Sequence, residues 1–277
     1  MILFSACNME SEEEISWKLE PHQDMLVVES LVTSELKQQS VHLTLTNSYF
    51  DSSAIKPVTG AIVQIKEGIN IYTFTEDTPG WYFSDEEFAG TPLKTYQLSV
   101  NLQTRINGLK DYSAISTMPE GIDIDSTNCE IYKMPEFSGF NNNEDTTLLA
   151  IFYFGNEPKN SGNFYMNKVY KNNIPLQSTP KEYLIYSDEY ANGEYSYLCI
   201  YNKNIAPGDT IRFRVYSIEK SFYKFIEGIK NIDLTGDSYS MSGPPANAVG
   251  NISDGKGLGF FAASYVSEKT SYAIDKR

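Results

Sequence analysis

Carboxylates and two histidines are the side chains of this sequence that could carry out acid–base chemistry. Asp85, Glu86 and Glu87 stand in a row and could supply the acid and base of a glycosidase, which places two carboxylates beside the scissile bond. They fall in a turn between two expected strands, where a solvated acidic cluster is the simpler interpretation. His22 and His42 have no nucleophile or orienting acid beside them in sequence, so they predict no catalytic triad. We therefore assign no catalytic residue.

Metal-binding patterns are equally weak. Asp123 and Asp125 could offer oxygens to calcium, but the further ligands of a calcium loop do not follow them. The three cysteines, Cys7, Cys129 and Cys199, have no metal-ligand spacing. We predict no metal site and no cofactor.

Three residue sets in the second half of the chain admit more than one interpretation. Cys129 and Cys199 sit in strand-like runs, where they could form a disulfide or remain as buried thiols. Four glycines lack the Lys-Ser/Thr ending of a phosphate loop, so we expect them to let the chain turn and pack closely before an aromatic strand. Six tyrosines could stack on sugars or pack within sheets. The glycines are Gly250, Gly255, Gly257 and Gly259, and the tyrosines are Tyr183, Tyr186, Tyr190, Tyr195, Tyr197 and Tyr201.

Cys7 has the most informative surroundings. The residues before it, "MILFSA", resemble the end of a bacterial lipoprotein signal, in which apolar and then small residues precede the cysteine that receives the lipid. Phe4 stands three residues before Cys7, where leucine is usual, and the basic region and most of the apolar region of such a signal are missing. The acidic "ESEEE" at residues 10–14 resembles the export signal of Bacteroidota surface lipoproteins. A solvated tail with a chance cysteine is the other interpretation.

The composition favours a mainly β chain and disfavours some partners. The 277 residues include 20 tyrosines and 15 phenylalanines against 2 tryptophans, an aromatic load that suits sheets. The formal charge of −14 repels phosphate backbones, so we expect no nucleic-acid partner. No window approaches the roughly 20 apolar residues of a membrane-spanning helix, so we expect membrane contact through a lipid anchor only.

Alternation of apolar and polar residues predicts two β domains. Seven short strands between residues 25 and 118 favour an N-terminal β-sandwich. Within it, "TEDTPGWYFSDEEFAGTPLKTYQLSV" at residues 75–100 resembles the transthyretin-like and carboxypeptidase-regulatory sandwiches, which implies a transthyretin-like or Ig-like domain. Residues 1–24 are the expected signal remnant and acidic tether, residues 119–126 the linker, and residues 127–277 a second, antiparallel β domain.

One helix is predicted in that second domain. Apolar residues recur at helical spacing in "SIEKSFYKFIEGIKNI", which places the helix over about residues 218–232. Phe222 and Phe225 share its apolar stripe, so we expect both to be buried against the second sheet.

Five segments together resemble a known family. They are "LVVESLVT", "GWYFSDEEFAGTPLKTYQLSV", "STMPEGIDIDS", "PGDTIRFRVYSIEKSFYKFIEGI" and "PPANAVGNISDGKGLGFFAASYVSEKT". The family comprises Bacteroidota envelope lipoproteins catalogued as a domain of unknown function (family 4249), and its members are often encoded beside TonB-dependent outer-membrane receptors. The resemblance implies an outer-membrane, cell-surface location and a receptor as partner. It assigns no catalytic residue.

The leading hypothesis is a non-catalytic cell-surface lipoprotein that binds a ligand or an outer-membrane receptor in TonB-linked nutrient uptake. A carboxylate-based surface hydrolase and a structural or adhesive envelope protein are the alternatives. The polar loop at residues 242–259 is the predicted partner contact, through Asn247, Asn251 and Asp254. The competing interpretation is that this loop covers a sheet edge and that its polar groups cap turns.

The assignment of Cys7 as the lipid-attachment residue predicts how the protein fractionates. Expressed with a complete signal, the protein should be recovered with the outer membrane, because the several acyl chains of a bacterial lipoprotein anchor stably whereas one chain binds only weakly. Cys7→Ser should release it into the soluble fraction, which immunoblotting of separated fractions would detect. A variant that stays in the membrane fraction would contradict the anchor.

Overall fold

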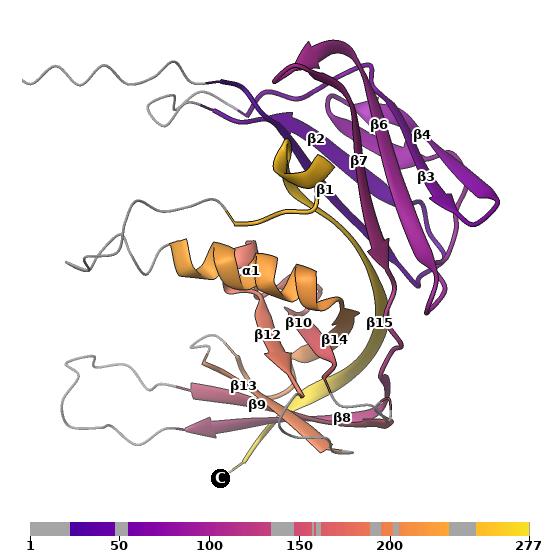
Figure 1. Cartoon of the computed structure of the whole chain (residues 1–277). Helices are drawn as coiled ribbons and strands as arrows, with labels where there is room; N and C mark the ends of the chain where they lie inside the picture. Colours follow the sequence, from indigo (N-terminus) through magenta and orange to yellow (C-terminus); the bar gives the residue numbers. More distant parts are fainter. Residues whose placement is uncertain are drawn as a thin grey trace, which may run out of the picture.

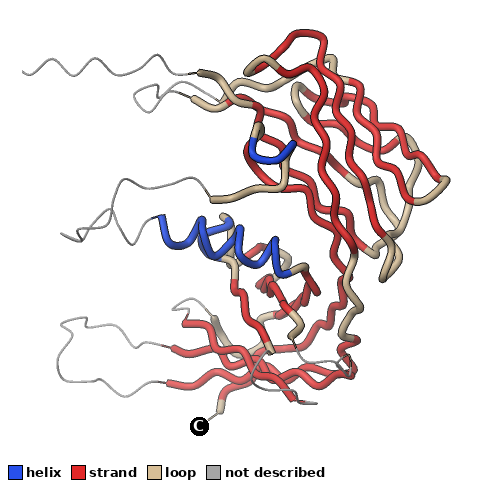
Figure 2. The backbone as a smooth tube through the Cα atoms, in the orientation of Figure 1, coloured by secondary structure: helices blue, strands red, loops and turns tan. Residues whose placement is uncertain are grey.

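The computed structural model describes residues 23–47, 55–133, 147–156, 158, 162–188, 195–201, 205–232 and 248–276. Within these residues the chain is mainly β, and hydrogen-bonded ladders join 15 strands (Figure 1, Figure 2). One α-helix, α1 (Lys220–Ile232), accompanies the strands in this part of the chain. No helix of the described residues is long and apolar enough to cross a bilayer. The predicted mainly β class with one packed helix is confirmed.

The N-terminal strands form one antiparallel sheet that folds over the first core as the predicted sandwich. In chain order they are β1 (Leu26–Thr33), β2 (Ser40–Leu45), β3 (Ile62–Glu67), β4 (Asn70–Thr78), β5 (Trp81–Ser84), β6 (Thr95–Ile106) and β7 (Leu109–Thr117). Across the sheet their order is β1-β2-β5-β4-β3-β6-β7. On β6, Tyr96, Leu98 and Val100 are buried in the core while the residues between them are exposed, as the alternation of a half-buried strand requires.

The second half of the chain packs two sheets against each other. Its strands are β8 (Asp123–Lys133), β9 (Thr147–Asn156), β10 (Phe164–Lys171), β11 (Ile174–Pro175), β12 (Leu184–Ser187), β13 (Tyr195–Tyr201) and β14 (Thr210–Ile218), with the single-turn helix η1 (Pro180–Glu182) before β12. β9 lies between β8 and β13, while β10 pairs with β11, β12 and β14. Buried residues from both sheets, such as Ile151 and Val215, share one core.

β8 begins inside the segment predicted as the linker. Ile122 and Ile124 are both buried and alternate with an acidic residue, which is the period of a strand. The Ile124 N–H also donates to Ser267 Oγ at 3.0 Å. Proline, glycine and acids suggested a linker over residues 119–126, but residues 118–122 alone lie between β7 and β8. The division of the chain into two domains stays a prediction.

One long strand, β15 (Leu258–Asp275), runs through both halves (Figure 1). Its first part pairs in parallel with β1, its middle pairs antiparallel with β14, and its last three residues pair in parallel with β8. The ladder with β8 departs from the antiparallel pairing predicted for the second half. Most of that half connects β8 to β15, which gives the chain the crossover that parallel neighbours need.

Glycine allows β15 to pass close to β1. Gly259 has φ +85°, and a Cβ there would lie 2.0 Å from the carbonyl oxygen of Val28. A Cβ on Gly250 would likewise lie 2.0 Å from the carbonyl oxygen of Gly259. The prediction that these glycines let the chain turn and pack closely is confirmed.

α1 packs against both halves of the molecule. Phe222 and Phe225 contact the cluster formed by β10 and β14, as predicted, but they are half-buried rather than buried. Their ring centres also lie 5.0 and 5.1 Å from that of Phe260, on the part of β15 that pairs with β1. Ile226, one turn after Phe222 on the helix, is fully buried. Each phenylalanine therefore contacts both the β10–β14 cluster and Phe260 and remains partly exposed.

The crossing at Gly259 predicts a strong position-specific loss of stability. Gly259→Ala should lower the free energy of unfolding by about 3 kcal/mol or more, because the new methyl group meets the Val28 carbonyl in addition to the strain of a positive φ. Gly255→Ala is the matched control, since Gly255 has the same φ of +85° with nothing within 4 Å of its Cβ position, and it should lose only about 1 kcal/mol. Chemical denaturation measures both, and equal losses would contradict the close approach.

Candidate functional site

Two of the four predicted site residues can be located. Cys7 and Asn247 lie outside the described residues, whereas Asn251 and Asp254 belong to the segment that leads into β15.

Asn251 joins this segment to two strands. Its Nδ2 donates to the carbonyl oxygens of Ile115 on β7, at 3.1 Å, and of Phe261 on β15, at 2.8 Å. Its Oδ1 accepts the Phe261 N–H at 2.9 Å. All three bonds go to strand backbone, so the side chain acts as a bridge between β7 and β15.

Asp254 lies in an exposed left-handed turn, the single-turn helix η3 (Ser253–Gly255). Ser253, Asp254 and Gly255 have φ values of 45°, 53° and 85°, a conformation that costs an L residue roughly 1–2 kcal/mol. Ser253 Oγ accepts the N–H of Ser113 on β7 at 2.9 Å. The N–H groups of Gly255 and Gly257 donate to the carbonyl oxygen of the buried Ile252. Several bonds therefore hold the turn in a strained shape.

Two apolar side chains near Asn251 face solvent. Val249 is 85% exposed, and Ile115, whose carbonyl accepts the Asn251 bond, is 59% exposed. Ala248 approaches the helix, since its Cβ lies 3.2 Å from the position that a Cβ on Gly228 of α1 would occupy. We call residues 248–256 together with Ile115 the loop surface. Helix and strands hold it from both sides.

Of the carboxylates considered for catalysis, Asp85 is engaged with neighbouring side chains, whereas Glu86 and Glu87 are exposed. Asp85 accepts hydrogen bonds from the hydroxyls of Thr73 at 2.5 Å and Thr75 at 2.7 Å, and these bonds hold the pKa of the Asp85 carboxyl below its usual range. The general acid of a glycosidase needs a raised pKa, whereas the pKa of Asp85 is shifted in the opposite direction. Asp123 accepts a hydrogen bond from Tyr265, which raises the pKa of Tyr265 to about 12. Within the described residues, no three His, Cys, Asp or Glu side chains gather as a metal site.

His42 belongs to an aromatic pair on the outer face of the N-terminal sheet. Its ring stacks on Trp81, with centroids 4.0 Å apart and planes 11° apart, and its Nδ1 lies 3.0 Å from Glu29 Oε2. Glu29, His42 and Trp81 are cross-strand neighbours on β1, β2 and β5. Pairs of this kind stabilise a sheet by roughly 0.2–1 kcal/mol each.

The tyrosine and cysteine sets have structural positions where they are described. Tyr186 stacks on Tyr165 at 4.9 Å and packs against the core of the second half, and the side chains of Tyr190, Tyr195, Tyr197 and Tyr201 lie outside the described residues. Cys129 is a free, buried thiol, and its burial raises the pKa of the thiol to about 11. Cys129 pairs with Ile151 on β9, while Cys199 pairs with the adjacent Ala150. The possible disulfide is therefore not formed.

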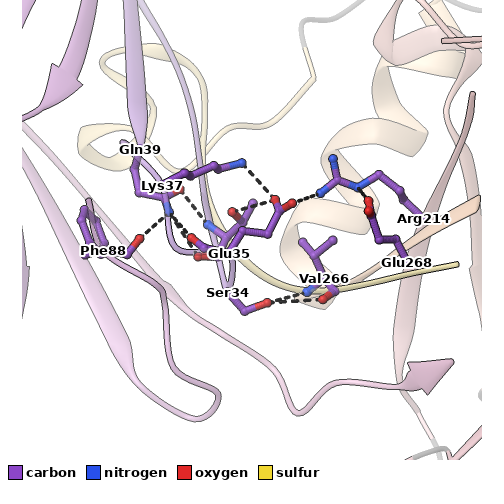
Figure 3. Close-up of polar contacts among 9 residues, drawn as sticks. Ser34, Glu35, Lys37, Gln39, Phe88, Arg214, Val266 and Glu268 are labelled. Carbon is purple, nitrogen blue, oxygen red and sulfur yellow. Dashed lines mark hydrogen bonds and ion pairs between the residues drawn. The ribbon is translucent and has the colours of Figure 1, made fainter. Parts of the chain in front are cut away.

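A polar junction links the N-terminal sandwich to β14 and β15 (Figure 3). Glu35, in the turn after β1, pairs with Arg214 of β14 and with Lys37 at 3.0 Å. Arg214 Nε also lies 3.2 Å from an oxygen of Glu268 on β15. The buried Gln39 holds the turn in place, because its Nε2 donates to the carbonyl oxygens of Glu35 and Phe88, among others.

Two further cations, Lys168 and Arg212, lie on the same face of the β10–β14 pair as Arg214. The sequence analysis did not identify them. Lys168 of β10 pairs with Arg214 in the strand register, and Arg212 pairs with Tyr170. The Arg212 guanidinium carbon lies 4.3 Å from the centre of the Tyr170 ring. Cations and aromatics recur at every second residue in "KVY" and "RFRVY", which was the available signal.

A comparison with family models gives one match over nearly the whole chain. The model described as "Domain of unknown function (DUF4249)" matches residues 12–270. The chain belongs to this family. No curated protein matches this member of the DUF4249 family.

Solved structures give only distant likenesses. The FN1–FN3 domains of chicken CNTN1 align with a TM-score of 0.25 and 12% identity. The alignment covers 69% of this chain and 59% of the CNTN1 chain. The BSP domain of a biofilm-associated protein aligns with a TM-score of 0.20 and 8% identity, over 90% of this chain and 58% of that one. The Fcho1 mu homology domain from Danio rerio, solved with an Eps15 peptide, aligns with a TM-score of 0.19 and 6% identity, over 92% of this chain and 96% of that one. Scores this low show no shared fold.

The junction predicts a pH-dependent contribution from Glu35. Burial acts to raise the pKa of this carboxyl, but hydrogen bonds from Arg214 and Lys37 outweigh it and hold the pKa below its ordinary value of 4.5. Because the folded-state pKa is lowered, the stabilisation is present above pH 4.5 and is lost as the pH falls through the lowered value. Glu35→Gln should thus cost about 1 kcal/mol at pH 7, since solvent screens this half-exposed group, and the difference from wild type should shrink below pH 4.5.

Urea denaturation across this pH range measures the effect. Glu87→Gln removes an exposed carboxylate in the turn before Phe88 and should change the stability by less than about 0.5 kcal/mol at any pH. A Glu35→Gln difference that stays constant with pH would contradict the role of the carboxylate charge.

Proposed function

We propose that this member of the DUF4249 family is a non-catalytic cell-surface lipoprotein, anchored to the outer membrane through Cys7, that contacts an outer-membrane receptor in TonB-linked nutrient uptake. The acidic run at residues 10–14 and the resemblance to Bacteroidota envelope lipoproteins support the location. The charge of −14 suits a solvated surface and disfavours nucleic acid as the partner.

The loop surface is the observation that carries this proposal. Val249 and, on β7, Ile115 expose apolar side chains. Asn251, Ser253 and Ala248 hold the segment that carries Val249 against β7, β15 and α1. A surface that is already ordered loses little conformational entropy on binding. Exposed apolar residues at its centre supply the contact area that drives association.

The structure changes which loop residues should be tested. Asn251 directs all of its observed bonds to strand backbone, so its loss would affect the fold before it affected a partner. The side chain of Val249, which is 85% exposed, has no such role in the fold. Substitutions at these two positions therefore distinguish a contact with a partner from a role in folding.

Affinity purification from detergent-solubilised envelope tests the contact. Val249→Asp should reduce the recovery of a TonB-dependent receptor, identified by mass spectrometry, by about tenfold, because it places a charge in an apolar contact, and it should leave Tm within about 2 °C. Ile69→Asp, at a residue that is 96% exposed on the β3–β4 hairpin, is the matched control and should change neither quantity.

Asn251→Ala completes the comparison. It should lower Tm by several degrees, because it leaves strand backbone groups without partners at a cost of about 1–3 kcal/mol. Full receptor recovery with Val249→Asp would show that the loop surface is not the contact. Absence of any receptor with the wild-type protein would contradict the proposed partnership itself.

A further inference from the structure

Two turns at one end of the N-terminal sandwich expose aliphatic side chains. The turn between β3 and β4 carries Ile69, which is 96% exposed, and the turn before β6 carries Leu93, which is 65% exposed. The turns are neighbours, because β3 pairs with β6 and Glu67 beside the first turn lies opposite Tyr96 near the second (Figure 1). Ile71, at the start of β4, is exposed as well. We call Ile69, Ile71 and Leu93 the tip surface.

Leu93 occupies a backbone position that favours glycine. The Lys94 N–H donates to the carbonyl oxygen of Thr91 at 3.2 Å, which closes a four-residue turn with Pro92 in second place. Leu93, in third place, has φ +64°, and turns with this conformation usually carry glycine or asparagine there. Because the side chain is mostly exposed, little packing offsets the strain. An exposed leucine that the turn itself disfavours points to a role outside the fold.

The turn between β3 and β4 does not require an apolar residue either. Glu67 and Asn70 are the last pair of the ladder, so the turn consists of Gly68 and Ile69. Gly68 supplies the positive φ, at +58°, as the first position of a two-residue hairpin turn demands. The second position usually carries a polar residue. Isoleucine therefore exposes an apolar side chain at the tip without a need of the hairpin.

The charge around the tip surface differs in sign from that of the whole chain. Lys66, which lies opposite Ile71 in the ladder, and Lys94, which follows Leu93, are both exposed. Residues 66–71 and 91–95 contain these two lysines and one acid, Glu67, which accepts a hydrogen bond from Tyr72 at 3.4 Å. The two turns thus combine aliphatic tips with a small positive charge, in a protein whose formal charge is −14.

We propose that the tip surface inserts into the interface of a lipid bilayer. Aliphatic side chains enter the boundary of the acyl chains, while lysines extend apolar stems beside them and place their ammonium groups at the lipid phosphates. Three side chains on two turns offer far less than the roughly 800 Å² per partner that a stable protein interface buries. A bilayer needs no matching shape, so two separate turns can each insert.

This bilayer contact is distinct from the receptor contact proposed at the loop surface. It also requires no lipid on Cys7. If the protein is anchored as proposed, the tether adds to the insertion, because it keeps the two turns at a high local concentration beside the membrane.

Flotation with phosphatidylcholine vesicles tests the insertion on the full chain without its lipid. The wild-type protein should float with the vesicles, and the bound fraction should rise with the lipid concentration. Ile69→Asp and Leu93→Asp should each lower the binding constant about tenfold, because a carboxylate replaces an inserted aliphatic group. Ile174→Asp is the matched control at a 67% exposed residue of β11, and it should stay within about twofold of wild type.

Leu93→Gly separates membrane insertion from a role in the fold. Glycine adopts φ +64° without strain, so Tm should be unchanged or higher, while vesicle binding should weaken about threefold or more. A lower Tm together with unchanged vesicle binding would assign Leu93 to the fold. That result, the absence of the wild-type protein from floating vesicles at every lipid concentration, or an equal loss of binding in Ile174→Asp would overturn the proposal.

Discussion

The continuity of β15 is the constraint on which the rest of the structure depends. This strand supplies the neighbour of β1 at its start, of β14 in its middle and of β8 at its end. Neither half can therefore complete its sheets before the C-terminal residues are in place. The pairing of β1 with β15 joins the two ends of the described chain, and contacts so distant in sequence slow folding because the loop must close before they stabilise it. The close passage at Gly259 is the local requirement of that arrangement.

At β7, side chains bond to backbone groups that no strand ladder pairs. The outer edge of β7 does not pair with β15; instead, Ser253 and Asn251 bond to its backbone, and Glu219 accepts the Thr117 N–H at 3.0 Å. Ser116 Oγ accepts the N–H of Ala263 and donates to the Glu219 carboxylate at 2.5 Å. Because Glu219 directly precedes α1, this edge, the helix and β15 are fixed to one another. A covered edge is also protected from pairing with other chains.

Local periodicity predicted most strands, because alternation such as Tyr96, Leu98 and Val100 depends only on which face of a strand is buried. The partners of β15 could not be predicted in this way, since its apolar sequence suits parallel and antiparallel ladders equally. The position of Asn251 illustrates the same limit at the candidate site: its amide suggested recognition, yet three strand backbone groups use it. The cations on β10 and β14 were visible as a pattern, but the loss of one charge to Glu35 follows only from the three-dimensional junction.

The distribution of satisfied and open groups indicates where recognition can occur on this protein. A partner that recruits Asn251 or Asp85 must first break bonds that these side chains already make, and each broken bond removes about 1–3 kcal/mol from the interaction. Val249 and Arg212 carry no such penalty, because the first faces solvent and the second already has its guanidinium fixed by stacking rather than by an acid. Arg212 lies on β14, and Val249 lies on a segment that Asn251 bonds to β7 and β15, so little further ordering is needed on binding. Polar residues that look functional in the sequence, such as Asn251 and Asp85, therefore build the scaffold here, while apolar side chains such as Val249 stay exposed without making such bonds.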